Sequence, residues 1–399
     1  MTDTSFPDDF LIGAATAAHQ IEGNNVNSTW WALEQRAGSF VSEPSGDAAD
    51  SLHRWPDDLD LVASLGYHAY RFSIEWARIE PAPGQFSRAM ILHYQRQIDG
   101  CIERGIVPVV TLHHFTEPLW FAKTGGWAGD NAAELFARYV GAVAHILEPV
   151  PWIATINEPN MVACAIGTLR RATGRAPAEP DDVPGAPLGP PDEAVAHGLT
   201  AGHHAVRELL HESVPGAKIG WTIANQVVQA APGGEQHADR YRERIEDRFL
   251  RESVHDDFVG VQAYSRNVFG PDGPVHDDAP DTRTLMGWEY FPDTLEHAVR
   301  HTREVVGNVP ILVTENGIAT SDDTRRIAYT RSALEGLQRA MADGVDVRGY
   351  LHWSLLDNYE WGSYRPTFGL VAWDKDTFDR HPRESARWLG HVARTRRLA

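Results

Sequence analysis

Two stretches of the sequence, "WIATINEPN" (residues 152–160) and "ILVTENGIAT" (residues 311–320), begin as apolar runs and then reach a glutamate. Short apolar runs rich in β-branched residues are typical of buried strands. Glu158 is followed by a proline, which ends a strand, and Glu315 is followed by Asn-Gly, which favours a turn. Packing alone does not explain why a buried strand ends on a carboxylate. Because both stretches share this feature, we look for one explanation of both.

Short apolar runs alternate with longer amphipathic segments along the whole chain. The pattern predicts strands at 11–14, 69–74, 107–112, 153–156, 218–223, 258–262, 311–314 and 348–353. Segments with apolar residues at helical spacing fall between most of them, at 55–66, 90–105, 131–147, 191–212 and 325–344. This alternation predicts a (β/α)8 TIM barrel in which residues 1–399 form a single domain. A doubly wound sheet is the alternative, but no glycine-rich phosphate loop follows a predicted strand.

A barrel supplies the common reason for the two glutamates. The active site of a TIM barrel lies at the C-terminal ends of its strands. Glu158 and Glu315 would end the fourth and seventh strands and therefore face one mouth. Other polar or aromatic residues fall at corresponding places on other strands: Arg71, His113, His114, Tyr264 and Trp353.

The amino-acid composition indicates which classes of partner the chain can bind and in which cellular compartment it is expected. Lys and Arg number 36 against 55 Asp and Glu, which gives a formal net charge of −19. Such a chain is poorly suited to nucleic acid or anionic membranes. Cys101 and Cys164 are expected to be buried free thiols, which fits a reducing cytoplasm. The apolar run at 10–18 is short and follows acidic residues, so we expect no export signal, and no run is long enough to span a membrane.

One segment resembles a linker. Residues 171–193 contain six prolines, from Pro177 to Pro191. Because strands and helices alternate on both sides, we expect a long loop after the fourth strand. A domain boundary is the alternative.

The motifs together resemble glycoside hydrolase family 1, the β-glucosidase family, over most of the chain. They are "FLIGAATAAHQIEG" (10–23), "YRFSIEWARIEP" (70–81), "TLHHFTEPLWF" (111–121), "TINEPN" (155–160), "VTENG" (313–317), "WSLLDNYEW" (353–361) and "FGLV" (368–371). The resemblance implies a retaining β-glycosidase, with β-glucosidase as the leading interpretation. It makes Glu315 the nucleophile and Glu158 the acid/base. Arg71 and Tyr264 match residues that keep the nucleophile ionised.

The resemblance also implies a set of sugar-binding residues. Asn157 would bind the 2-hydroxyl, and Trp353 would lie beneath the sugar ring. The remaining hydroxyls would meet Gln20, His114 and Glu360, with Trp361 beside them. The expected substrates are small β-glycosides or short oligosaccharides, with no cofactor and no metal. Adjacent histidines on a strand point to opposite faces, so His113 and His114 make a poor chelate.

The chain departs from the family pattern at several places. Phe115 and Thr116 replace a tryptophan and an acidic residue, and Gln262 replaces an asparagine whose hydrogen bond to the acid side of the site is then in question. The connection at 224–249 is compact, which predicts an open aglycone side that accepts bulky or apolar groups.

Other functions remain to be separated from β-glucosidase. They are a β-galactosidase or β-fucosidase, a transglycosidase, a 6-phospho-β-glycosidase, a sugar-binding barrel without catalysis, and a metal-dependent hydrolase. A phosphate would meet the carboxylate of Glu360, which disfavours the 6-phospho activity. The presence of both glutamates disfavours a barrel that only binds sugar.

Overall fold

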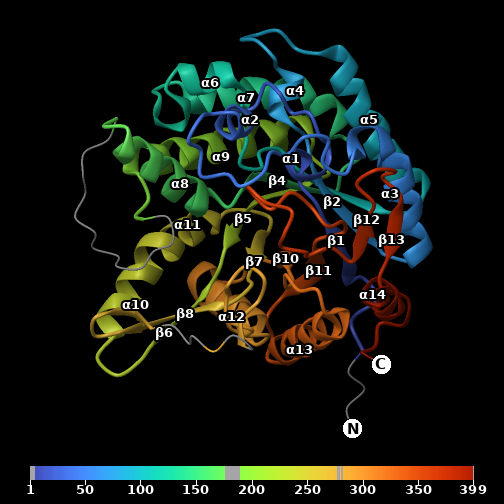
Figure 1. The fold of residues 1–399 in the computed structure, drawn as a ribbon, viewed down its shortest axis with the longest axis vertical. Coiled ribbons are helices and arrows are strands. Elements are labelled where there is room, and N and C mark those ends of the chain that lie inside the picture. Colours follow the sequence, from blue (N-terminus) through green and yellow to red (C-terminus); the bar gives the residue numbers. More distant parts are fainter. Residues whose placement is uncertain (1–4, 176–188, 276–278, 280–281, 399) are drawn as a thin grey trace.

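The computed structural model describes residues 5–175, 189–275, 279 and 282–398. Parallel strands form a closed barrel in the order β1-β11-β10-β7-β5-β4-β3-β2 (Figure 1). These strands are β1 (Leu11–Ala15), β2 (Ala69–Ser73), β3 (Val107–Thr111), β4 (Trp152–Asn157), β5 (Lys218–Ala224), β7 (Val259–Gln262), β10 (Ile311–Asn316) and β11 (Val347–Trp353). Each corresponds to a predicted strand, so the TIM barrel is confirmed.

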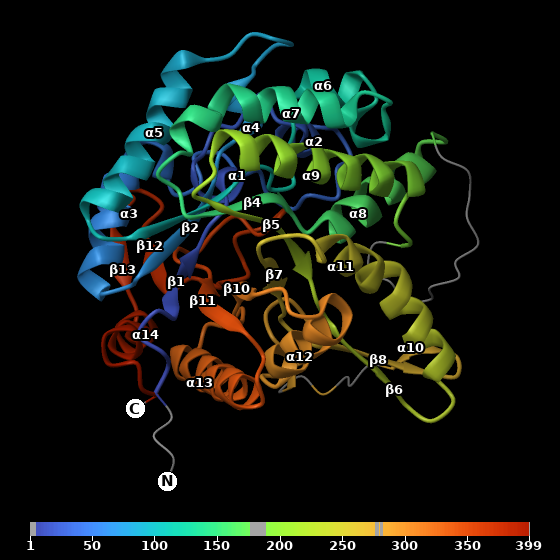
Figure 2. The same ribbon diagram turned by 180° about the vertical axis from the view of Figure 1, so that it is seen from behind.

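Helices surround the barrel, as the two opposite views in Figures 1 and 2 show. The longer ones are α3 (Ser51–Leu65), α5 (Arg88–Glu103), α7 (Ala132–Val143), α8 (Pro159–Ala172), α9 (Glu193–Ser213), α12 (Thr294–Val306), α13 (Asp323–Ala342) and α14 (Glu384–Thr395). Shorter helices are α1 (Ala18–Ile21), α2 (Thr29–Glu34), α4 (Trp76–Ile79), α6 (Leu119–Lys123), α10 (Glu235–Tyr241) and α11 (Arg248–Leu250). All five predicted helical segments are confirmed within a few residues.

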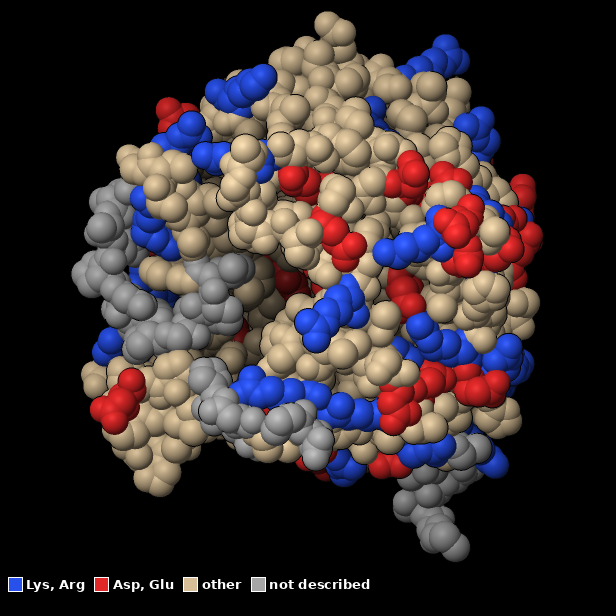
Figure 3. Space-filling model, in the orientation of Figure 1, with Lys and Arg blue, Asp and Glu red and all other residues tan. Residues whose placement is uncertain are grey.

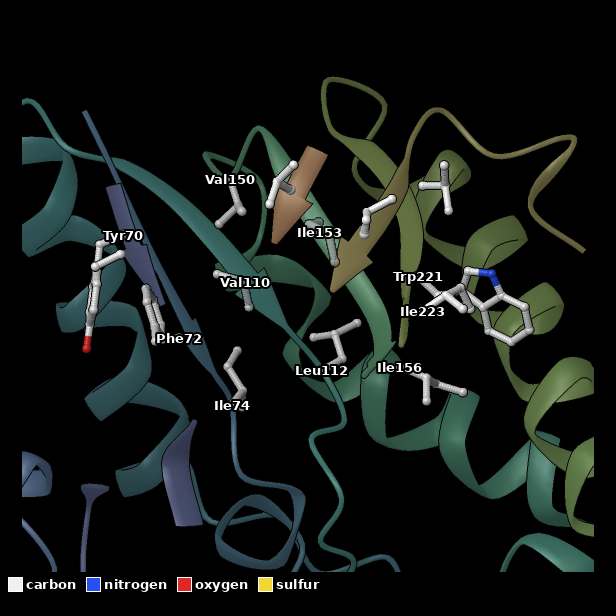
Figure 4. Close-up of a cluster of buried hydrophobic side chains, with 14 of the residues drawn as sticks. Tyr70, Phe72, Ile74, Val110, Leu112, Val150, Ile153, Ile156, Trp221 and Ile223 are labelled. Atoms are coloured by element: carbon white, nitrogen blue, oxygen red, sulfur yellow. The ribbon is translucent and has the colours of Figure 1, made fainter. Parts of the chain in front are cut away.

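The two faces of the barrel strands bury different kinds of side chain. Tyr70 and Phe72 of β2 pack with Val110 in the large apolar layer that includes the surrounding helices (Figure 4). The intervening Ala69 belongs to a second, smaller cluster, and Arg71 is fully buried on the same face. Side chains alternate between the two faces of a strand, so Ala69 and Arg71 share the face that points into the barrel. This face carries both small apolar and polar residues.

Two small sheets outside the barrel were not predicted. One contains β6 (Val227–Ala230), β8 (Arg266–Gly270) and β9 (Gly273–Val275), and the other pairs β12 (Val371–Trp373) with β13 (Arg380–Pro382). These strands are short and partly exposed, so they lack the apolar pattern of a buried strand. Helix α10 and a π-helix at Arg242–Asp247 lie in the connection at 224–249, which was predicted to be compact.

The proline-rich segment lies between α8 and α9, within the connection from β4 to β5. Residues 176–188 of this segment lie outside the described residues, so the loop stays a prediction, as does the single domain. Cys101 and Cys164 are free and buried. Among the described helices, none has the length and apolar character needed to cross a membrane.

Candidate active site

The turn after β4 holds Glu158 in an unusual backbone conformation. Glu158 has φ 44° and ψ 59°, in the left-handed region, and Pro159 begins α8 immediately afterwards. Non-glycine residues rarely adopt this region, and it persists where the surroundings fix it. The backbone N–H of Glu158 donates to the Thr222 carbonyl at 2.7 Å, and that of Asn157 donates to the His113 carbonyl at 2.8 Å. A hydrogen bond to β5 therefore holds the backbone of Glu158, and a hydrogen bond to the segment after β3 holds the residue before it.

The carboxyl group of Glu315 is held by a cation and a phenol. Its Oε1 accepts from Arg71 Nη1 at 2.6 Å, and its Oε2 accepts from the Tyr264 hydroxyl at 2.5 Å. Arg71 is itself fully buried, and its Nε donates to Thr111 Oγ1 at 3.0 Å. Burial raises the pKa of Glu315, whereas Arg71 and Tyr264 lower it.

The carboxyl group of Glu158 has no such support. No described residue makes a hydrogen bond with its side chain. Burial raises the pKa of Glu158 well above its usual value, and the charge of Glu315 raises it further, against a lowering by Arg71. The cation and the phenol contact Glu315, so Glu315 keeps the charge more easily. Of the two carboxyl groups, Glu158 therefore holds the proton.

Asn157 stands between these groups and offers one unused donor. Its Oδ1 accepts from Arg71 Nη2 at 2.6 Å, Gln262 Nε2 at 2.8 Å and Thr222 Oγ1 at 3.0 Å. Its Nδ2 is buried and has no partner among the described residues. Gln262 thus reaches the residue directly before Glu158, although the sequence left this hydrogen bond in question. The free amide N–H groups of Asn157 can serve a ligand.

Gln20 and Glu360 form a second polar group of the site. Gln20 Nε2 donates to Asn358 Oδ1 at 3.0 Å, while its buried Oε1 has no partner among the described residues. Glu360 Oε2 accepts from Gln20 Nε2 and from Trp353 Nε1, each at 3.4 Å. Burial raises the pKa of Glu360 to about 8, with a contribution from the charge of Glu315. Oε1 of Gln20 is a free acceptor, and Glu360 is held only by long contacts.

Aromatic rings form a flat wall beside these polar groups. The His114 ring lies nearly parallel to Trp353 at 5.9 Å and 14°, and to Trp361 at 6.1 Å and 16°. Phe115 meets Trp361 edge-on at 4.9 Å. Burial, with the charge of Arg71, lowers the pKa of His114 well below its usual value, so its imidazole is neutral. Such rings cover the apolar face of a sugar, and a neutral imidazole can donate and accept hydrogen bonds.

His113 and His203 each have a carboxylate partner of their own. His113 pairs through Nε2 with Glu117 at 3.2 Å, away from the stack of His114. His203 is buried against Asp256 at 3.1 Å. Across the described residues, no group of three or more His, Cys, Asp or Glu side chains could hold a metal ion. Figure 3 shows a hollow on one face of the molecule with acidic atoms in its depth.

Two hydroxyl residues of the site were missed from the sequence. Thr111 accepts a hydrogen bond from Arg71, and Thr222 donates to Asn157. Each is a threonine in the C-terminal half of a mainly apolar strand, in "VPVVT" and "KIGWTIA". That position was the available signal, because the C-terminal ends of the strands form the site.

The family model described as "Glycosyl hydrolase family 1" matches residues 2–271 and 272–398. The chain belongs to glycosyl hydrolase family 1. As a member of this family it is a hydrolase, and its barrel is the architecture of solved family 1 structures. A crystal structure of the β-glycosidase BGL167 is 45% identical, covers 99% of this chain and 98% of its own, and has a TM-score of 0.90.

Relatives from bacteria match this family 1 chain over its length. "Beta-glucosidase A" of Thermotoga maritima is 31% identical over 461 aligned positions, covering 100% of both chains. The "Bifunctional beta-D-glucosidase/beta-D-fucosidase" of Bifidobacterium breve is 31% identical, covering 96% of this chain and 97% of its own. A solved family 1 β-glucosidase of Thermotoga maritima has a TM-score of 0.87 at 29% identity, covering 99% of this chain and 100% of its own. The 461 positions exceed the 399 residues of this chain, so the first relative has insertions.

Proposed function

We propose that this chain is a retaining β-glucosidase that hydrolyses terminal, non-reducing β-D-glucosyl residues by double displacement. One observation carries the proposal: Glu315 is bonded to Arg71 and Tyr264, whereas the Glu158 side chain has no described hydrogen-bond partner. A retaining glycosidase needs one ionised carboxylate as nucleophile and one protonated carboxyl group as acid. The two environments separate these roles in the way the reaction requires.

In the first step Glu315 attacks the anomeric carbon while Glu158 gives its proton to the departing oxygen. The aglycone leaves, and a covalent glycosyl ester forms on Glu315. The ester has no negative charge, so the electrostatic contribution that raised the pKa of Glu158 disappears. Glu158 can then take a proton from water, and the water oxygen attacks the anomeric carbon. The ester bond to Glu315 breaks, and the sugar leaves with its original anomeric configuration.

The unused polar atoms support binding of a glucosyl ring. Asn157 Nδ2 would donate to the 2-hydroxyl, an interaction that strengthens in the transition state. Gln20 Oε1, His114 and Glu360 would bind the 3-, 4- and 6-hydroxyls, and Trp353 would lie beneath the ring. Asn157 Nδ2 and Gln20 Oε1, two buried atoms that have no partner in the described part of the chain, suit such a ligand.

The choice of sugar rests on the relatives. Several are named β-glucosidases, and the Bifidobacterium relative also carries the name β-D-fucosidase. We therefore propose glucose as the main sugar, with fucose and galactose as secondary ones. Transglycosylation uses the same residues and would appear as transfer products at high acceptor concentration.

We also propose an open aglycone side and a cytoplasmic location. The Thermotoga relative has insertions that this chain lacks, and the two buried free thiols of this chain suit a reducing compartment. Aryl glucosides with compact and bulky aglycones of equal leaving-group pKa test the first proposal, and equal rates would contradict it. Cell fractionation tests the second.

The function is tested with a panel of aryl β-glycosides with gluco, galacto, fuco and manno rings. We expect the gluco compound to give the highest kcat/KM, and NMR to show the β-anomer as first product. A 2-deoxy-2-fluoro-glucoside should trap the ester on the peptide that contains Glu315, as mass spectrometry of a digest would show. First release of the α-anomer, or no activity on any of the sugars, would refute the proposal.

A further inference from the structure

Gln262 is a buried residue of the site to which the family resemblance assigns no certain contact. It ends β7, is fully buried, and lies opposite Glu315 in the pairing of β10 with β7. Its Nε2 donates to Asn157 Oδ1 at 2.8 Å, Thr222 Oγ1 at 3.1 Å and Thr314 Oγ1 at 3.3 Å. One amide nitrogen therefore contacts side chains from β4, β5 and β10.

The chemistry of the neighbours fixes the orientation of both amides. The guanidinium of Arg71 can only donate, so the atom of Asn157 at 2.6 Å from Nη2 must be the oxygen. An oxygen at that place accepts from Gln262 only if Nε2 faces it. Reversing either amide would place two donors or two acceptors against each other. The orientation therefore follows from hydrogen-bonding chemistry.

This orientation has a consequence for Asn157. Its Oδ1 accepts three hydrogen bonds, from Arg71, Gln262 and Thr222, and its Nδ2 is buried without a described partner. A rotation that turned Nδ2 toward the three donors would break all three bonds. The side chain is thus locked with its N–H groups free.

The space beneath Gln262 also depends on a small residue. At Gly260, two residues earlier on β7, a Cβ atom would lie 2.4 Å from Thr222 Cγ2 and 2.9 Å from Thr314 Oγ1. The glycine leaves room for both threonines, whose hydroxyls Gln262 contacts. The contacts of Gln262 with Thr222 and Thr314 therefore depend on the glycine at position 260 as well as on Gln262 itself.

We propose that Gln262 is a positioning residue that acts through Asn157 Oδ1 to aim the Asn157 amide at the substrate 2-hydroxyl. The inference rests on the proposed glucosidase function. Gln262 sets how strongly the enzyme depends on that hydroxyl. Gln262 also helps to lower the pKa of Glu315, and loss of that effect would slow all substrates alike. Loss of the contact with Asn157 should slow only the substrates that carry a 2-hydroxyl.

The test compares an aryl β-glucoside with its 2-deoxy analogue, using the native enzyme and Gln262→Met. Methionine keeps the length of the side chain and removes the amide. We expect kcat/KM on the glucoside to fall about tenfold and that on the 2-deoxy analogue to change less than about twofold. Gln97→Met, the same change at a buried site on α5, should alter neither value.

A double variant shows whether the effect passes through Asn157. In an Asn157→Ala background, Gln262→Met should cost less than about twofold more on the glucoside, because the group it positions is absent. Gln262→Leu, which also removes the amide but has a shorter side chain, should change the substrate ratio as Gln262→Met does. It serves in place of Gln262→Met if that variant fails to fold by thermal unfolding.

Three results would overturn the proposal: equal losses on both substrates, no loss on the glucoside, or fully additive losses in the double variant. Absence of activity of the native enzyme on both substrates is a different result, because it would refute the proposed function itself.

Discussion

The surroundings of Glu158 and Glu315 differ more than their positions do. Both residues lie at the C-terminal ends of barrel strands, and burial raises the pKa of both. Glu315 receives hydrogen bonds from Arg71 and Tyr264, while the Glu158 side chain receives none from the described residues. One amino-acid type thus serves as anion or as acid according to the donors around it.

The largest effect is expected from removing the anionic partner. Glu315→Gln keeps the shape of the side chain but leaves no nucleophile, so kcat/KM on aryl β-glucosides should fall by at least about 10⁴-fold. Steady-state kinetics with a stable fold by circular dichroism measures this. A residual activity within tenfold of the native enzyme would remove Glu315 from the mechanism.

Removal of the acid should have a smaller effect that depends on the leaving group. Glu158→Ala should lower kcat/KM by about 10²–10⁴-fold on aglycones with a high leaving-group pKa. The loss in the first step should shrink for acidic phenols, because these depart without a proton. A series of aryl glucosides measures the slope, and a loss independent of the leaving group would contradict the role of acid.

Loss of one hydrogen-bond donor to Glu315 should reduce the difference in pKa between Glu158 and Glu315 without abolishing it. Tyr264→Phe removes a hydrogen bond that lowers the pKa of Glu315, so that pKa should rise. The acidic limb of the kcat/KM profile reports the free enzyme, so it should move to higher pH. At neutral pH we expect a loss of about tenfold. An acidic limb that stays in place would separate Tyr264 from the ionisation of Glu315.

The smallest effect concerns stability. The pKa of Glu360 is raised from 4.5 to about 8, so the folded state binds its proton more tightly than the unfolded state does. Stability is therefore lost as pH rises from about 4.5 to 8. Glu360→Gln removes this loss, and its Tm relative to the native enzyme should be higher at pH 9 than at pH 5. Because Glu360 is partly exposed, the gain should be small, on the order of 1–2 °C. An equal Tm difference at the two pH values would contradict the shift.

The barrel and the residues at its strand ends were predictable because both follow from local pattern. Each barrel strand is an apolar run. Arg71 contacts Asn157 and Glu315, and Tyr264 contacts Glu315, because parallel strands end at one mouth. Family resemblance then supplied the expected roles, which remain to be tested.

The cross-strand contacts of the site were not predictable in the same way. Asn157 lies opposite Thr222 only after a register shift between β4 and β5. Such a shift leaves no mark in a single sequence, so the sequence does not predict that the Thr222 hydroxyl contacts Asn157. The same holds for β6 and β8, whose pairing joins segments from two different connections.

Titration of the two carboxyl groups tests most directly which of them is protonated. Carbon-13 NMR of enzyme with labelled glutamate side chains would follow them, with Glu158→Gln and Glu315→Gln for assignment. We expect the higher pKa to belong to Glu158 and to fall when Glu315 is esterified by a 2-deoxy-2-fluoro-glucoside. A higher pKa on Glu315, or a pKa of Glu158 that does not change on esterification, would contradict this expectation.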